Sequence, residues 1–136
     1  MADLSITTTA IIATDGYGFN DMVAGETVAR GKPVYTKAAD GKAWLAGCEG
    51  TSAVATVTGI CLNDAAASQP VRVMISGNLA FGAILTVGMI YVLSASGLIA
   101  PHSDLATSDY VSVLGVATTS SNLRLAIINS GVEVPA

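Results

Sequence analysis

Two stretches of this sequence decide its fold: AGETVARGKPVY at residues 24–35 and FGAILTVGMIYV at residues 81–92. They align at an offset of 57 positions, which places Gly31 on Gly88 and Val34-Tyr35 on Tyr91-Val92. A glycine kept in both copies usually marks a turn or a close approach of two backbones. The alignment therefore predicts that one β unit is used twice in the chain.

The alignment continues downstream of both stretches with small gaps. Residues 59–61 (GIC) resemble residues 115–117 (GVA), and residues 71–75 (VRVMI) resemble residues 123–127 (LRLAI). In the second pair, apolar residues alternate with an outward arginine, which is the period of two expected of a strand. Two copies are too few for a solenoid, so we expect a compact pseudo-symmetric domain. The predicted pseudo-repeats cover about residues 24–77 and 81–131.

Turn residues separate the other β-like stretches. Asp40-Gly41 is a hairpin signal, and Ser96-Gly97 is its counterpart in the second copy. Short strands with such turns are typical of an all-β barrel or sandwich, and no stretch supports a long helix. A single helical turn is predicted at residues 65–67. The predicted strands cover residues 26–30, 33–38, 42–47, 54–62, 70–75, 83–86, 89–94, 97–100, 110–118 and 122–128.

The start of the chain precedes the repeats. We assign residues 1–22 to an N-terminal arm or edge strand and residues 23–136 to the β domain. Residues 4–12 (LSITTTAII) are rich in β-branched side chains and predict a strand. Two interpretations remain open: this strand pairs with a neighbouring molecule, or it forms an edge of its own sheet.

The composition indicates a covered surface. Fifty-one per cent of the residues are hydrophobic and 12% are charged, against about 25% charged in a typical soluble domain. We therefore expect copies of the chain or a larger assembly to cover part of the surface. The net charge of −4 and the six basic residues argue against nucleic acid as a partner, because phosphate binding needs a positive surface.

One long segment lacks charge altogether. Residues 73–103 contain no charged residue, and residues 79–100 have the hydropathy of a membrane helix. The equivalent part of the first copy carries six charged residues, so a shared fold excludes a membrane span. We expect residues 79–100 to form a subunit or partner interface, with filling of the domain's own core as the alternative. The candidate interface residues are Leu79, Phe81, Ile84, Leu85, Met89, Ile90, Tyr91 and Leu93, with Ile6 and Ile11 from the arm.

No pattern in the sequence predicts catalytic, cofactor-binding or metal-binding residues. His102 is the only histidine, and no Gly-x-Ser-x-Gly elbow accompanies it, so a serine hydrolase is not supported. Cys48 and Cys61 lack the spacing of a zinc site. We expect two free, buried thiols, with a disulfide between them as the alternative. Residues 1–3 lack the basic charge of a secretory signal, so we expect synthesis in the cytoplasm.

Five ordered blocks of the sequence resemble one protein family. The blocks are residues 24–35, 59–73, 76–77, 85–94 and 97–101, within a match that spans about residues 24–131. They are similar to the tailed-phage capsid decoration proteins, also called cement proteins. The resemblance implies a small β-barrel of the β-clip or tulip-like kind, which forms homotrimers. It also implies a structural virion protein that binds the major capsid protein on the outer surface of an expanded icosahedral head and clamps its capsomers. The family carries no catalytic motif to transfer.

Two other classes of function remain open. A glycan-binding or receptor-binding module of a phage tail or fibre would present aromatic side chains on loops, for which Tyr17, Phe19, Trp44 and Tyr110 are the candidates. A trimeric β-clip enzyme, such as a nucleotide hydrolase, would need a carboxylate-rich site and a phosphate-binding glycine/serine motif. The sequence shows neither of these patterns.

Overall fold

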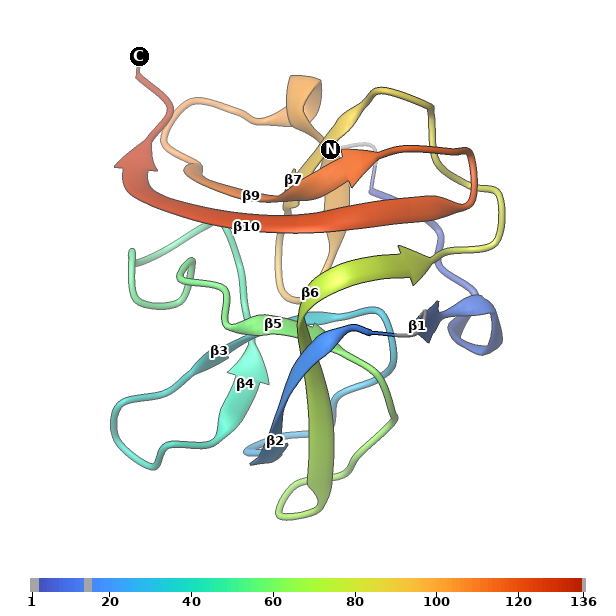
Figure 1. Cartoon of the computed structure of the whole chain (residues 1–136). Coiled ribbons are helices and arrows are strands. Elements are labelled where there is room, and N and C mark those ends of the chain that lie inside the picture. Colours follow the sequence, from blue (N-terminus) through green and yellow to red (C-terminus); the bar gives the residue numbers. More distant parts are fainter. Residues whose placement is uncertain (1–2, 14–15, 136) are drawn as a thin grey trace.

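The protein is all-β, as predicted. A computed structural model describes residues 3–13 and 16–135, which contain ten strands, two short 3-10 helices and no helix long enough to cross a membrane. The strands pair antiparallel in one sheet that curls into a half-barrel (Figure 1). The 3-10 helices are η1 (Thr8–Ala10) and η2 (His102–Asp104). The strands are β1 (Ile12–Ala13), β2 (Gly18–Val23), β3 (Pro33–Thr36), β4 (Ala43–Leu45), β5 (Gly59–Cys61), β6 (Pro70–Ala80), β7 (Ile90–Leu93), β8 (Ile99–Pro101), β9 (Tyr110–Ala117) and β10 (Asn122–Glu133).

The pairing of the strands repeats along the chain. In the first copy, β3 lies between β4 and β5, and β5 pairs with β6; in the second, β7 lies between β8 and β9, and β9 pairs with β10. The registers agree as well, since Pro33 opposes Ile60 and Ile90 opposes Val116. These positions are related by the offsets of 57 and 56 that align the two sequences. The two copies of the sequence thus correspond to two sets of four paired strands.

The turn before the central hairpin of each copy is also the same. The Gly31 N–H donates to the Cys61 carbonyl at 2.9 Å, and the Gly88 N–H donates to the Ala117 carbonyl at 2.8 Å. Both glycines have positive φ, at 84° and 80°, which a residue with a side chain adopts only with strain. The glycines that align in the sequence therefore perform the same conformational task in the structure.

Strand β6 joins the two sets of strands. Residues 70–76 pair with β2, and residues 77–80 pair with β10. Gly77, with φ of 109°, lies where β6 passes from one set to the other, and Figure 1 shows the strand bending beside β2 and then running along β10. We call the strands beside the first part of β6 (β2–β5) the first-copy sheet, and those beside its end (β1 and β7–β10) the second-copy sheet.

The first copy begins earlier than the sequence alignment indicated. Val23 opposes Pro70 across β2 and β6, and Ala80 opposes Asn122 across β6 and β10. Val23 and Ala80 are 57 residues apart, and Pro70 and Asn122 are 52 residues apart. The two copies align at these same offsets, so β2 and the end of β6 are equivalent strands. Residues 18–22, assigned from the sequence to a segment outside the repeats, therefore belong to the first copy.

The N-terminal segment packs on its own domain. The Leu4 N–H donates to the Ile99 carbonyl at 2.7 Å, β1 pairs with the end of β6, and the side chain of Ile11 is buried. Of the strand predicted at residues 4–12, only Ile12 lies in a strand, as the first residue of β1. The prediction of one continuous strand is wrong, because these β-branched side chains cover apolar surface without a ladder partner for their backbone.

Other short elements differ from their predictions for local reasons. Residues 26–30 and 83–86 form no strand; Val28 instead exchanges two backbone hydrogen bonds with Ala65 in an isolated bridge. That bridge also takes the place of the predicted helical turn at residues 65–67. Residues 54–58, the start of the strand predicted at 54–62, form no strand. Residues 54 and 55 belong to a turn in which the Ala55 N–H donates to the Thr51 carbonyl.

Two apolar cores hold the domain together. The central core contains Ile60 and Met74 of the first-copy sheet together with Tyr91 and Leu123 of the second-copy sheet. A second core lies on the opposite face of the first-copy sheet, around Val34, Cys61 and Val73. The middle of the first-copy sheet, at β5 and the start of β3, is therefore buried on both of its faces.

Cys48 and Cys61 are free and buried, as expected. Burial raises the pKa of the Cys48 thiol to about 11 and that of the Cys61 thiol to about 12. Nearby carboxylates, Asp109 and Asp64 respectively, add to these increases in pKa. Because the thiolate is the reactive form, both cysteines should be inert in the folded protein at neutral pH.

This expectation can be measured with a thiol reagent that absorbs on reaction. At pH 8 the native protein should release no chromophore over the time in which protein unfolded in guanidinium releases two equivalents. The unfolded sample is the control for reagent and protein concentration. Rapid release of one equivalent from the native protein would contradict the burial of that cysteine.

Candidate functional site

The outer face of the second-copy sheet carries a row of four directly paired residues. Ile90 opposes Val116, Val116 opposes Arg124, and Arg124 opposes Asn78. Directly opposed residues in antiparallel strands point to the same face, so the four side chains lie side by side. We call this set the outer row. Ile90 and Val116 are each 37% exposed, and Val87, in the turn before β7, adds an apolar side chain that is 64% exposed.

The same two apolar positions are buried in the first copy. Pro33 and Ile60 occupy the places of Ile90 and Val116, and Ile60 is fully buried in the central core. The second-copy sheet is covered on its inner face, while its outer face has no equivalent cover among the described residues. One copy of the repeat therefore buries a face that the other leaves open.

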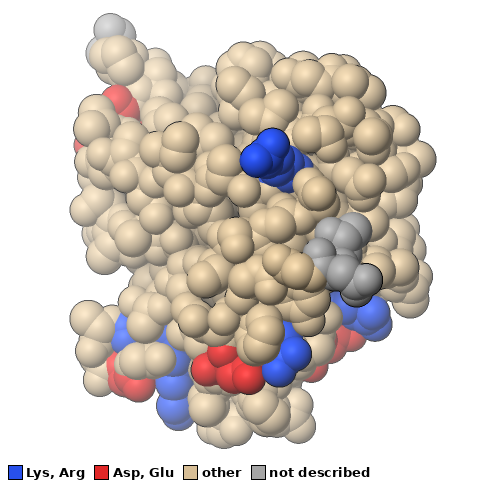
Figure 2. Space-filling model, viewed as in Figure 1, with Lys and Arg blue, Asp and Glu red and all other residues tan. Residues whose placement is uncertain are grey.

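Charge is distributed just as unevenly. Between residues 74 and 132 the sequence has three charged residues, Asp104, Asp109 and Arg124. Figure 2 shows most of the visible charged side chains gathered over the part of the molecule that contains the first-copy sheet, while the part above it shows one basic residue and a little acidic surface at its upper left edge. The surface of the second copy is thus suited to contact with an apolar or neutral surface.

The structure separates the ten candidate interface residues into two groups. Six are buried in the central core, where they are out of reach of another molecule, so the alternative of core filling holds for them: Leu79, Phe81, Leu85, Tyr91, Leu93 and Ile11. Ile6, Ile84 and Met89 are half-buried, and Ile90 is exposed in the outer row. The β7–β8 hairpin is apolar because it supplies side chains to the core of its own domain.

Sequence reasoning missed Val116 and Arg124 as surface residues of interest. Val116 lies in the apolar segment VLGVA at residues 113–117, where the sequence does not distinguish inward from outward side chains. Its pairing with Ile90 and Arg124 shows that it faces outward. A signal was present, because Val116 aligns with Ile60 and Arg124 with Arg72. Comparison of equivalent positions in the two copies would have drawn attention to both.

The aromatic candidates for glycan binding are largely occupied by other contacts. The guanidinium of Arg72 lies 3.9 Å from the centre of the Phe19 ring, and the ammonium of Lys37 lies 4.1 Å from that of Trp44. Tyr17 packs against Phe19 with ring centres 5.6 Å apart. A sugar would have to displace a cation from the ring face at either site, so these side chains do not form an open stacking platform.

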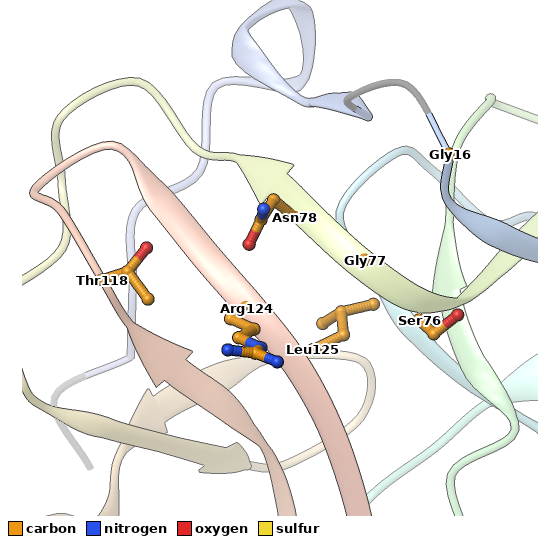
Figure 3. Close-up of a pocket in the computed structure, with 7 residues that line it drawn as sticks. All are labelled: Gly16, Ser76, Gly77, Asn78, Thr118, Arg124 and Leu125. Atoms are coloured by element: carbon orange, nitrogen blue, oxygen red, sulfur yellow. The ribbon is translucent and has the colours of Figure 1, made fainter.

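A polar pocket of about 500 Å³ adjoins the outer row (Figure 3). It lies over the paired strands β6 and β10, next to the bend of β6 at Gly77. Within residues 3–13 and 16–135, no group of three or more metal-ligating side chains comes together. The lining residues are Gly16, Ser76, Gly77, Asn78, Thr118, Arg124 and Leu125.

Compared with known proteins, the chain matches no protein-family model and no curated protein. The likeness to decoration proteins rests on the ordered sequence blocks.

Proposed function

We propose that this chain is a structural virion protein that binds the outside of an expanded icosahedral phage head and clamps neighbouring capsomers. It acts as a homotrimer, contacts the major capsid protein and catalyses no reaction. The observation that carries the proposal is the open outer face of the second-copy sheet. In the first copy the equivalent residues, Pro33 and Ile60, are buried within the domain. Ile90 and Val116 therefore occupy positions that are buried in one copy of the β unit and exposed in the other.

The sequence blocks and the distribution of charge support the same function. The blocks that resemble decoration proteins span most of both copies. The outer face of the second copy combines exposed apolar side chains with a near absence of charge, which is typical of a surface that meets another protein.

A clamp of this kind stabilises a shell by mass action. A protein that binds the assembled shell and not the free subunits adds RT ln(1 + [L]/Kd) to the stability of the assembly. A trimer that grips three sites gains avidity of about 10²–10⁴ over one subunit. Modest contacts around Ile90 and Val116 are therefore sufficient for firm attachment.

The test is co-sedimentation with expanded heads, with light scattering to measure the oligomeric state. Val116→Asp and Ile90→Asp place a charge in the apolar part of the outer row. Each should weaken head binding or trimer formation by about 100-fold, because an unpaired charge in an apolar contact is costly. Both side chains are partly exposed, so circular dichroism of the free variants should remain that of the wild type.

Val23→Asp is the matched control. Val23 is 42% exposed in β2 of the charged first-copy sheet, and its replacement should leave both oligomeric state and head binding unchanged. Equal binding by all three variants would remove the outer row from the interface. A wild-type protein that does not sediment with its cognate heads would overturn the proposed function itself.

A further inference from the structure

Asp21 and Arg72 form a carboxylate–guanidinium pair across β2 and β6. The Arg72 Nε donates to Asp21 Oδ1 at 2.9 Å, and Nη2 donates to Oδ2 at 3.2 Å. This two-bond geometry matches the planar fork of arginine to a carboxylate. The hydrogen bond from Arg72 lowers the pKa of Asp21 below its usual value, so the carboxylate stays ionised in this pair.

The equivalent pair in the second copy lacks the carboxylate. Asp21 opposes Arg72 in the register of β2 and β6, and Asn78 opposes Arg124 in the register of β6 and β10. The offsets between the two pairs are again 57 and 52 residues, so Asn78 stands where the first copy has Asp21. An amide can accept a hydrogen bond but carries no charge, so position 78 cannot neutralise the guanidinium of Arg124.

The surroundings of Arg124 leave room for a ligand. Arg124 is exposed and lines the polar pocket of about 500 Å³, and Figure 3 shows Asn78 and Thr118 on either side of it. The hydroxyl groups of Ser76 and Thr118 add hydrogen-bonding capacity to the lining. Among the described residues that line the pocket, none is acidic.

We propose that the pocket around Arg124 binds a carboxylate group supplied from outside the chain, which pairs with the guanidinium of Arg124 as Asp21 pairs with that of Arg72. The shared chemistry is that of an aspartate or glutamate side chain on a docked protein and of a free small carboxylate. This site does not depend on head binding. The class of its ligand is inferred from the first copy, where the equivalent arginine, Arg72, binds the carboxylate of Asp21.

The experiment is an NMR titration that follows the Nε–Hε signals of the arginines. The probes are N-acetyl-aspartate amide, its uncharged analogue N-acetyl-asparagine amide, and acetate. The aspartate probe should shift the Arg124 signal in a saturable way and leave the Arg72 signal in place, because Asp21 already occupies Arg72. The asparagine probe should bind at least about ten-fold more weakly, since hydrogen bonds to charged groups contribute about 1.5–3 kcal/mol.

Two variants exchange the arrangements of the two copies. Asn78→Asp supplies the missing carboxylate internally and should weaken the response of Arg124 by about ten-fold or more, whereas Asn78→Ala should keep it. Asp21→Asn gives the first copy the arrangement of the second and should make Arg72 responsive to the probe. Arg124→Gln identifies the signal and should abolish the response.

The outcomes separate the sources of the ligand and test the site. Tighter binding of the aspartate probe than of acetate indicates a protein side chain, and equal binding indicates a free carboxylate. A response of Arg124 that is absent, not saturable or unchanged by Asn78→Asp would overturn the proposal. Asp15 precedes Gly16 and lies outside the described residues; a response that occurs only in Asp15→Asn would show an internal ligand and would also overturn it.

Discussion

Replacement of Gly115 by alanine should destabilise the protein by about 3 kcal/mol, the upper end of the cost of overpacking. A Cβ atom at Gly115 would overlap the backbone carbonyl of Arg124 on the neighbouring strand. The equivalent Gly59 faces the backbone carbonyl of Met74 in the same way, so Gly59→Ala should have a similar effect. Backbone cannot rotate aside as a side chain can. Urea unfolding followed by circular dichroism measures the loss as a change in midpoint at constant slope.

Gly41→Ala is the control for this prediction. Gly41 has φ of 69° and open space where a Cβ would lie, so only backbone strain of about 1 kcal/mol opposes the alanine. If Gly115→Ala were as mild as Gly41→Ala, β9 and β10 could not approach each other as closely as they do here. A loss at Gly59 or Gly115 of about 3 kcal/mol is large against a total stability of about 5–15 kcal/mol.

Replacement of Phe81 by alanine should cost about 3–5 kcal/mol through the cavity that it leaves. Phe81 is buried in the central core, and its backbone N–H bonds to the Ser121 carbonyl. Ala24 occupies the same place in the first copy, with its N–H bonded to the Gln69 carbonyl. The substitution therefore gives the second copy the residue of the first, and it should keep the backbone while emptying the core. The measurement is the same urea unfolding.

Phe19→Ala is the matched control, because Phe19 is 42% exposed. It should cost about 1 kcal/mol or less, the range of an exposed cation–π contact such as that with Arg72. Similar losses at positions 19 and 81 would mean that Phe81 does not fill the centre of the molecule.

Much of the fold could be predicted from the sequence because the repeat lies in residues with strong local preferences. Gly31 and Gly88 fix the turn before each central hairpin, and Asp40-Gly41 sets the turn within the first. These residues act through their own backbone angles, so their effect can be inferred without knowledge of distant partners.

The outer row could not be predicted in the same way, because it depends on the register between strands. That register is set by contacts between residues that are far apart in the sequence. The register of β9 on β10 differs by two residues from that of β5 on β6, since Ala117 opposes Leu123 and Cys61 opposes Val73. A shift of two residues leaves the same side chains facing inward. The pattern of apolar residues in the sequence is therefore the same for both registers and cannot predict which one forms. Comparison of the two copies draws attention to positions 116 and 124, but the exposure of Val116 beside Arg124 follows only from the pairing of the strands.

The strand shared by the two copies also determines how the molecule transmits force. Because residues 70–76 of β6 belong to one sheet and residues 77–80 to the other, tension applied to either sheet passes to the other along a single covalent backbone. Two sheets joined only by a flexible loop would swing apart under the same tension. Because β2 and β10 pair with successive parts of β6, this strand couples the two sheets mechanically. A force applied to one sheet is therefore resisted by the hydrogen bonds of both.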